Sequence, residues 1–134
     1  MRATRAELAL ALATLALGAC SPAPAPCAHA VLPDCTGAAA PDFATLQATV
    51  LARRCVVGSA CHSLAEHSGG LVLETRDVAF ADLSTRVAPG DAECSALAER
   101  ITTSSPTRRM PPAGGLSDAE RCEILAWIEA GALP

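Results

Sequence analysis

The chain has 134 residues and a formal net charge of −4, and all ten of its basic residues are arginine. An acidic balance without a basic stripe argues against a nucleic-acid partner. The only aromatic residues are Phe43, Phe80 and Trp127, so a domain of this size needs disulfides, a bound cofactor or both to complete its core.

Residues 1–19 have the pattern of a lipoprotein signal peptide. Arg2 and Arg5 precede an apolar run of ten residues, Leu8–Leu17, which is too short to span a bilayer and typical of a signal-peptide core. The run ends at Leu17-Gly-Ala-Cys20, which resembles the lipobox of bacterial lipoproteins, where the chain is cut before the cysteine. The alternative is an ordinary signal peptide that is cut at a nearby small residue.

Lipidation of Cys20 implies a protein held in the bacterial cell envelope by diacylglycerol and palmitate chains. By analogy with lipoproteins, Ser21 after the cysteine favours the outer membrane, facing the periplasm or the surface. Residues 20–41 are then a connecting region. Alternating prolines in Ser21–Pro26 favour an extended tether, and residues 27–41 are expected to form an irregular, cross-linked lead-in.

Residues 42–134 are expected to form one small folded domain. Asp42 is a suitable N-cap for a first helix. Apolar side chains at helical spacing follow it (Phe43, Leu46, Val50, Leu51). Beyond this helix, Leu71–Leu73 has an extended pattern, and Val78–Leu83 is expected to form a short helical turn.

Two further helices are expected in the C-terminal half. The first of these starts near Asp91 and carries one apolar stripe (Cys94, Leu97, Ala98, Ile101). The last helix opens with a capping box, Ser117-Asp-Ala-Glu120, in which the serine caps the helix and the glutamate reaches back. Gly131 is a natural C-cap for it.

The most specific chemical signal is the group Cys55, Cys61 and His62. In c-type cytochromes two thiols add to the heme vinyl groups, and the histidine after the second cysteine binds the iron. Five residues separate the two cysteines in this chain, where the usual spacing is two. The two thiols could instead form a disulfide, or bind zinc together with His62 and His67. His67 is otherwise expected to be a solvated loop residue.

Met110 is the only methionine left once Met1 is removed, and Pro111 and Pro112 fix the loop that carries it. A thioether on the far side of the iron from His62 would complete the His/Met ligand pair of cytochromes c, which raises the reduction potential. The alternative is a methionine that only fills a gap in the core.

The order of these motifs resembles a small class I cytochrome c, and in particular the cytochrome-c-like domains of myxobacterial and planctomycete lipoproteins. Besides Cys61-His62, the matching segments are Gly70-Leu-Val-Leu73, Pro89-Gly-Asp91, Met110-Pro-Pro112 and Trp127-Ile-Glu-Ala-Gly-Ala132. The resemblance covers residues 43–132. It implies an all-α fold, with three main helices and long loops around one heme.

The resemblance also implies one covalent heme c on Cys55 and Cys61, with His62 as proximal and Met110 as distal iron ligand. Such a protein is a membrane-anchored carrier of single electrons, and its partners are redox proteins of the envelope. It is not expected to be an enzyme, because both axial positions are filled and no catalytic constellation appears. The alternative function is a heme-free, disulfide-stapled lipoprotein with a binding or structural role.

The seven cysteines are consistent with this assignment. With Cys20 carrying lipid and two cysteines carrying heme, four remain for disulfides (Cys27, Cys35, Cys94, Cys122). An exported protein should oxidise them, and of three possible connectivities the expected pairs are Cys27 with Cys35 and Cys94 with Cys122. Four arginines flank the proposed ligands and would either bind heme propionates or form surface charge (Arg53, Arg54, Arg108, Arg109).

Overall fold

The computed structural model describes residues 27, 29–57 and 61–134. The predicted signal peptide, Cys20 and the tether therefore lie outside the described residues. Within those residues the secondary structure is helical and includes no strand, which confirms the expected all-α class. In that part of the chain, no helix is both long and apolar enough to cross a bilayer.

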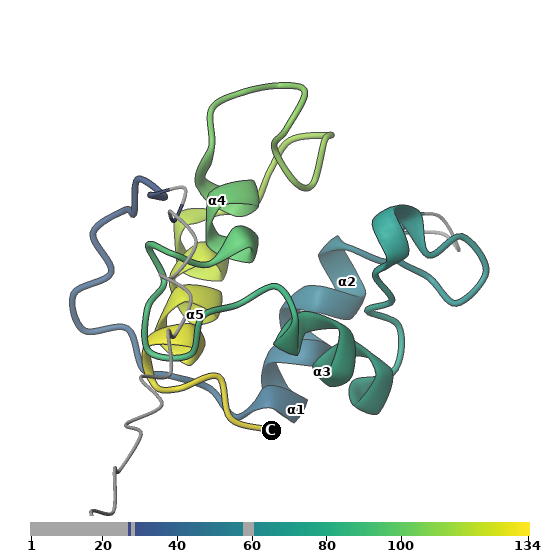
Figure 1. The fold of residues 1–134 in the computed structure, drawn as a ribbon, viewed down its shortest axis with the longest axis horizontal. Helices are drawn as coiled ribbons and strands as arrows, with labels where there is room; N and C mark the ends of the chain where they lie inside the picture. The colour runs from purple at the N-terminus through teal and green to yellow at the C-terminus, as the bar shows by residue number, and fades with distance from the viewer. Residues whose placement is uncertain (1–26, 28, 58–60) are drawn as a thin grey trace, which may run out of the picture.

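The helices form two groups. Figure 1 shows α4 (Ala96–Thr102) and α5 (Asp118–Glu129) on one side, and α1 (Phe43–Leu46), α2 (Ala52–Arg54) and α3 (Arg76–Ser84) on the other. Aromatic side chains join the groups, since the Phe43 ring lies 5.2 Å from both the Phe80 ring and the Trp127 ring, measured between centroids. The core is therefore continuous between the two groups.

The first helical segment begins as expected. The Asp42 side chain accepts a hydrogen bond from the Thr45 amide at 2.9 Å, so Asp42 is the N-cap. α1 continues through one π-helical turn, Gln47–Leu51, into α2, and the whole run buries the apolar residues expected from their spacing. The run ends at Cys55 and so delivers the first thiol to the site described below.

The middle of the chain contains more helix than the sequence indicated. Leu71–Leu73 is buried and contains no helix, and Leu71 has an extended backbone after a 3-10 turn at Ser68–Gly70. The short helical turn expected at Val78–Leu83 is in fact the nine-residue helix α3. Its buried face consists mainly of Ala79 and Leu83, so small side chains concealed the helical period.

The helix expected from Asp91 begins only at Ala96, and that expectation is wrong by five residues. The Asp91 side chain accepts from the Cys94 amide at 3.0 Å, and the Asp91 carbonyl accepts from the buried Ser95 hydroxyl at 2.8 Å. These local bonds hold a turn in place of the first helical turn. Cys94 therefore lies in a loop outside α4.

The last helix, α5, follows its sequence signals. The Glu120 amide donates to the Ser117 hydroxyl at 3.2 Å, and the Ser117 amide donates to the Glu120 carboxylate at 2.8 Å, which confirms the capping box. Gly131 follows the helix with a φ of +103°, the left-handed conformation that a glycine adopts without strain.

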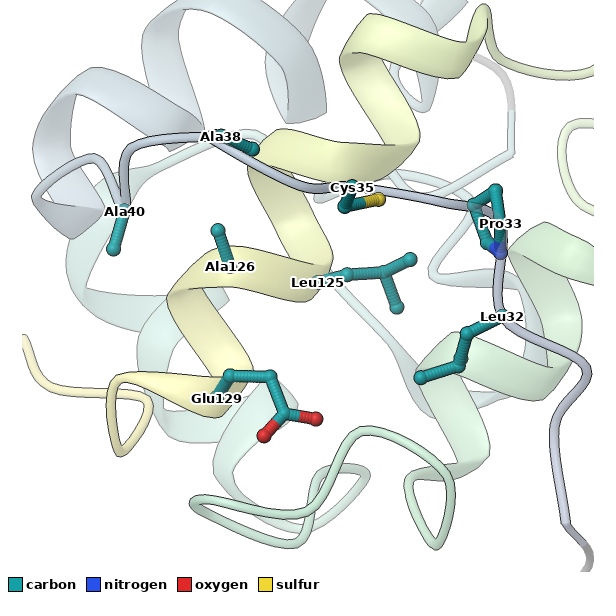
Figure 2. A pocket seen from close by; sticks show the side chains of 8 residues that line it. All are labelled: Leu32, Pro33, Cys35, Ala38, Ala40, Leu125, Ala126 and Glu129. Atoms are coloured by element: carbon teal, nitrogen blue, oxygen red, sulfur yellow. The ribbon is translucent and has the colours of Figure 1, made fainter.

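The four remaining cysteines form two disulfides, but the expected pairs are wrong. Cys27 bonds to Cys94 and Cys35 bonds to Cys122, across 67 and 87 residues of sequence. The lead-in does not fold back on itself: it runs along α5, where Figure 2 shows it passing over Leu125 and Ala126 beside a pocket of about 280 Å³. Because the lead-in follows this path, each of its two cysteines lies next to a cysteine that is distant in the sequence.

Candidate functional site

One cavity of about 450 Å³ lies between the two groups of helices. This volume is within the range of small-molecule and cofactor sites. Leucine and isoleucine side chains from five segments line it (Leu51, Leu71, Leu73, Leu83, Leu97, Ile101, Ile124). Cys55, Cys61, His62 and Met110 also line it. Four side chains selected from the sequence, and spread over 56 positions, are therefore gathered at a single apolar cavity.

The His62 ring is held in one tautomer. Its Nδ1 lies 3.2 Å from the Leu71 carbonyl oxygen, and because a carbonyl can only accept, Nδ1 carries the proton. The His62 backbone is fixed as well, since its carbonyl accepts from the Leu73 amide at 2.7 Å. The lone pair on Nε2 is left available, and a neutral imidazole in this state is a metal ligand.

The Cys55 and Cys61 thiols are both free of disulfide bonds. Cys55 is half-buried, and burial raises the pKa of its thiol to about 11, although the neighbouring Arg54 guanidinium acts in the opposite direction. Cys61 is exposed and has a φ of +64°, a conformation that costs a side chain about 1 kcal/mol or more. A cysteine rather than a glycine at this strained position is consistent with a role for the thiol.

In the heme-free protein, the exposed Cys61 is expected to be alkylated faster than Cys55 at pH 8. A pKa of about 11 leaves only about one Cys55 thiol in a thousand as the reactive thiolate at that pH. Raising the pH towards 11 should accelerate labelling of Cys55, since the thiolate fraction grows with pH below the pKa. Mass spectrometry after timed exposure to iodoacetamide measures both alkylation rates. The Cys61→Ser variant gives the rate of Cys55 without a contribution from Cys61. Equal rates at pH 8 would contradict the burial of Cys55.

Met110 lies on the loop between α4 and α5. Its amide donates to the Arg100 carbonyl at 2.8 Å, which ties the loop back to α4. Pro111 and Pro112 line the cavity beside it. The sulfur therefore belongs to a segment fixed by a backbone hydrogen bond and by two proline rings.

The cavity wall also carries positive charge. Arg54, Arg86 and Arg100 line it, and none of the described residues that line it carries a carboxylate. Arg54 is held by an ion pair to Glu120 at 3.1 Å, and Arg86 donates to the Gly69 carbonyl at 2.9 Å. A cationic, apolar cavity in an acidic protein fits a ligand that combines a large apolar body with carboxylates.

Only one of the three arginines that line the cavity was predicted from the sequence. Of the four arginines expected near a heme, Arg54 alone lines the cavity, while Arg108 pairs with Glu99 at 2.7 Å. Arg86 and Arg100 were missed because each is distant in sequence from the ligand motifs. Only the packing of α4 and of the loop after α3 brings them to the wall.

A zinc site at the Cys55 motif has no geometric basis. Among the described residues, the only His, Cys, Asp and Glu atoms that converge on a metal-sized position come from Cys27, His29 and Cys94, and both of these sulfurs are engaged in a disulfide. His67 is exposed, and its Nδ1 donates to the Leu64 carbonyl at 3.0 Å.

A family model described as Planctomycete cytochrome C matches residues 59–114. The match runs from the Cys61-His62 pair past Met110-Pro-Pro112 and leaves Cys55 and α5 outside it. It supports a cytochrome c-like domain and, with that domain, heme as the cofactor. No curated protein and no solved structure matches the chain.

The residues present fit a covalently held heme. Two free thiols, an imidazole with its Nε2 lone pair available, a thioether and three arginines all border the same apolar cavity. Each group has a chemical counterpart in a c-type heme: vinyl groups for the thiols, iron for the nitrogen and sulfur, and propionates for the guanidinium groups.

Proposed function

We propose that this protein is a membrane-anchored, monoheme c-type cytochrome that carries single electrons in the bacterial cell envelope. The observation that carries the proposal is the convergence of Cys55, Cys61, His62 and Met110 on one apolar cavity, with both thiols free. The family match over residues 59–114 is the independent support. Bound heme would supply a one-electron ferric/ferrous couple.

The side chains have distinct roles in this proposal. Cys55 and Cys61 would hold the heme as thioethers, while His62 Nε2 and the Met110 sulfur would be the two iron ligands. The apolar walls would keep water from a bound iron, which would favour electron transfer over reaction with small molecules. Two protein ligands would leave no open coordination position, so we propose an electron carrier and not an enzyme.

Anchoring is the second part of the proposal. It is supported by the signal-peptide pattern that ends at Cys20. A lipid on that cysteine would hold the domain at the outer membrane, facing the periplasm or the surface, where its redox partners would be other envelope proteins.

The test is heme staining of the protein on a denaturing gel, after purification from its native host. Covalent attachment predicts a stained band that survives denaturation. The single variants Cys55→Ser and Cys61→Ser should each weaken the stain, and the double variant should lose it. An unstained wild-type band, with a Cys55–Cys61 disulfide found by mass spectrometry, would overturn the proposal in favour of a heme-free lipoprotein.

A further inference from the structure

One peptide group joins a carboxylate to the proposed iron ligand. The carbonyl of the Leu71–Val72 peptide accepts from His62 Nδ1 at 3.2 Å, and the amide of the same peptide donates to Asp82 Oδ2 at 2.8 Å. In a trans peptide the N–H and the C=O point in opposite directions. The peptide therefore lies between the imidazole on one side and the carboxylate on the other.

The surrounding contacts fix this peptide in place. Leu71 and Val72 are each 9 % exposed, and Leu73 is 2 % exposed. Both backbone polar groups of the next residue are also hydrogen-bonded, because the Leu73 amide donates to the His62 carbonyl at 2.7 Å and the Leu73 carbonyl accepts from Gln47 Nε2 at 3.2 Å. The segment cannot rotate away from the imidazole without breaking several buried hydrogen bonds.

Asp82 lies half-buried on α3, and among the described residues it has no ion-pair partner. Its Oδ2 accepts from the Val72 amide. Hydrogen bonds in series polarise one another in a low-dielectric setting. An amide that donates to a carboxylate makes its own peptide carbonyl a stronger acceptor, which draws the Nδ1 proton of His62 further from the ring.

We propose that Asp82 is a positioning residue that acts on His62 through the Leu71–Val72 peptide, fixing the imidazole tautomer and raising the electron donation of Nε2. The inference rests on the proposed function, because its consequence concerns an iron ligand. A hydrogen-bond acceptor on the other ring nitrogen orients a metal-bound histidine and raises its basicity. A more basic ligand favours the ferric state, so Asp82 lowers the reduction potential, in opposition to the Met110 thioether.

The test compares Asp82→Asn with Asp77→Asn in the heme-loaded protein. Asparagine keeps the shape of Asp82 and removes its charge. Asp77 is an exposed acid on the same helix that, among the described residues, has an ion pair only with Arg76, so its variant controls for general loss of charge. We expect Asp82→Asn to raise the ferrous-to-ferric ratio at fixed ambient potential by about threefold to tenfold, where tenfold corresponds to about 59 mV for one electron. A shift no larger than that of Asp77→Asn overturns the relay.

A measurement on the heme-free protein separates this inference from the proposed function. Nitrogen-15 NMR of the wild type should show the His62 proton on Nδ1 and a strongly hydrogen-bonded Val72 amide. In Asp82→Asn the Val72 amide resonance should move upfield, and the Nδ1 proton should exchange faster with solvent. A His62 proton on Nε2 overturns the relay whether or not heme is ever attached, while unstained native protein overturns only the cytochrome proposal.

Discussion

Replacing His62 with alanine is expected to abolish the low-spin heme spectrum of the native protein. Among the described residues that line the cavity, His62 is the only histidine, and its Nε2 is the nitrogen that would bind a heme iron. Without it the iron keeps at most one strong protein ligand, and a single ligand gives a high-spin or water-ligated state. Absorption and electron paramagnetic resonance spectra of the ferric and ferrous forms measure the change.

The matched control is His67→Asn. His67 lies in the same loop, is exposed and has a φ of +31°, a backbone conformation that asparagine tolerates. Its replacement should leave the spectrum unchanged. Met110→Ala is the complementary variant: it should retain covalent heme but change the axial ligation and lower the potential. An unaltered ferric spectrum in Met110→Ala would show that the distal assignment is wrong.

Removing the Cys35–Cys122 disulfide is expected to lower the free energy of unfolding by about 4 kcal/mol. The bond closes a loop of 87 residues, which restricts the unfolded chain strongly. A domain with three aromatic residues has few large side chains to compensate. Urea unfolding of the Cys35→Ala/Cys122→Ala double variant, followed by circular dichroism, gives the difference.

The control for this prediction is the second disulfide. Cys27→Ala/Cys94→Ala opens a loop of 67 residues, so the chain-entropy cost should differ by only about 0.2 kcal/mol. Cys122 is also 9 % exposed and lies on α5. If removal of Cys35–Cys122 lowers the free energy of unfolding by more than the chain-entropy difference, the excess measures packing of the lead-in on the core. A loss below about 1 kcal/mol would mean that the lead-in is not cross-linked to α5 as described.

Local signals in the sequence gave reliable predictions. Asp42 and Ser117 both cap helices at the expected residues, because a cap depends on side chains within three positions of it. The group Cys55, Cys61, His62 and Met110 could likewise be selected from motif order, and the structure places all four at one cavity.

Features that depend on distant parts of the chain could not be predicted in the same way. The disulfide pairs follow from the path of the lead-in over α5, and Arg86 and Arg100 reach the cavity only through tertiary packing. The late start of α4 has a different cause: bonds from Asp91 and Ser95 outweigh an apolar stripe that would otherwise extend the helix.

The Cys27–Cys94 disulfide would limit the distance between a lipid anchor at Cys20 and the folded domain. With lipid on Cys20, as proposed, Cys27 lies seven positions further along the chain, and even a fully extended chain of that length reaches only about 25 Å. Without cross-links the 22 residues from Cys20 to Asp42 could reach about 75 Å. A lipidated, oxidised protein would therefore be confined to a thin layer next to the membrane, where the local concentration of any membrane-bound redox partner would be high and partners further away would be out of range.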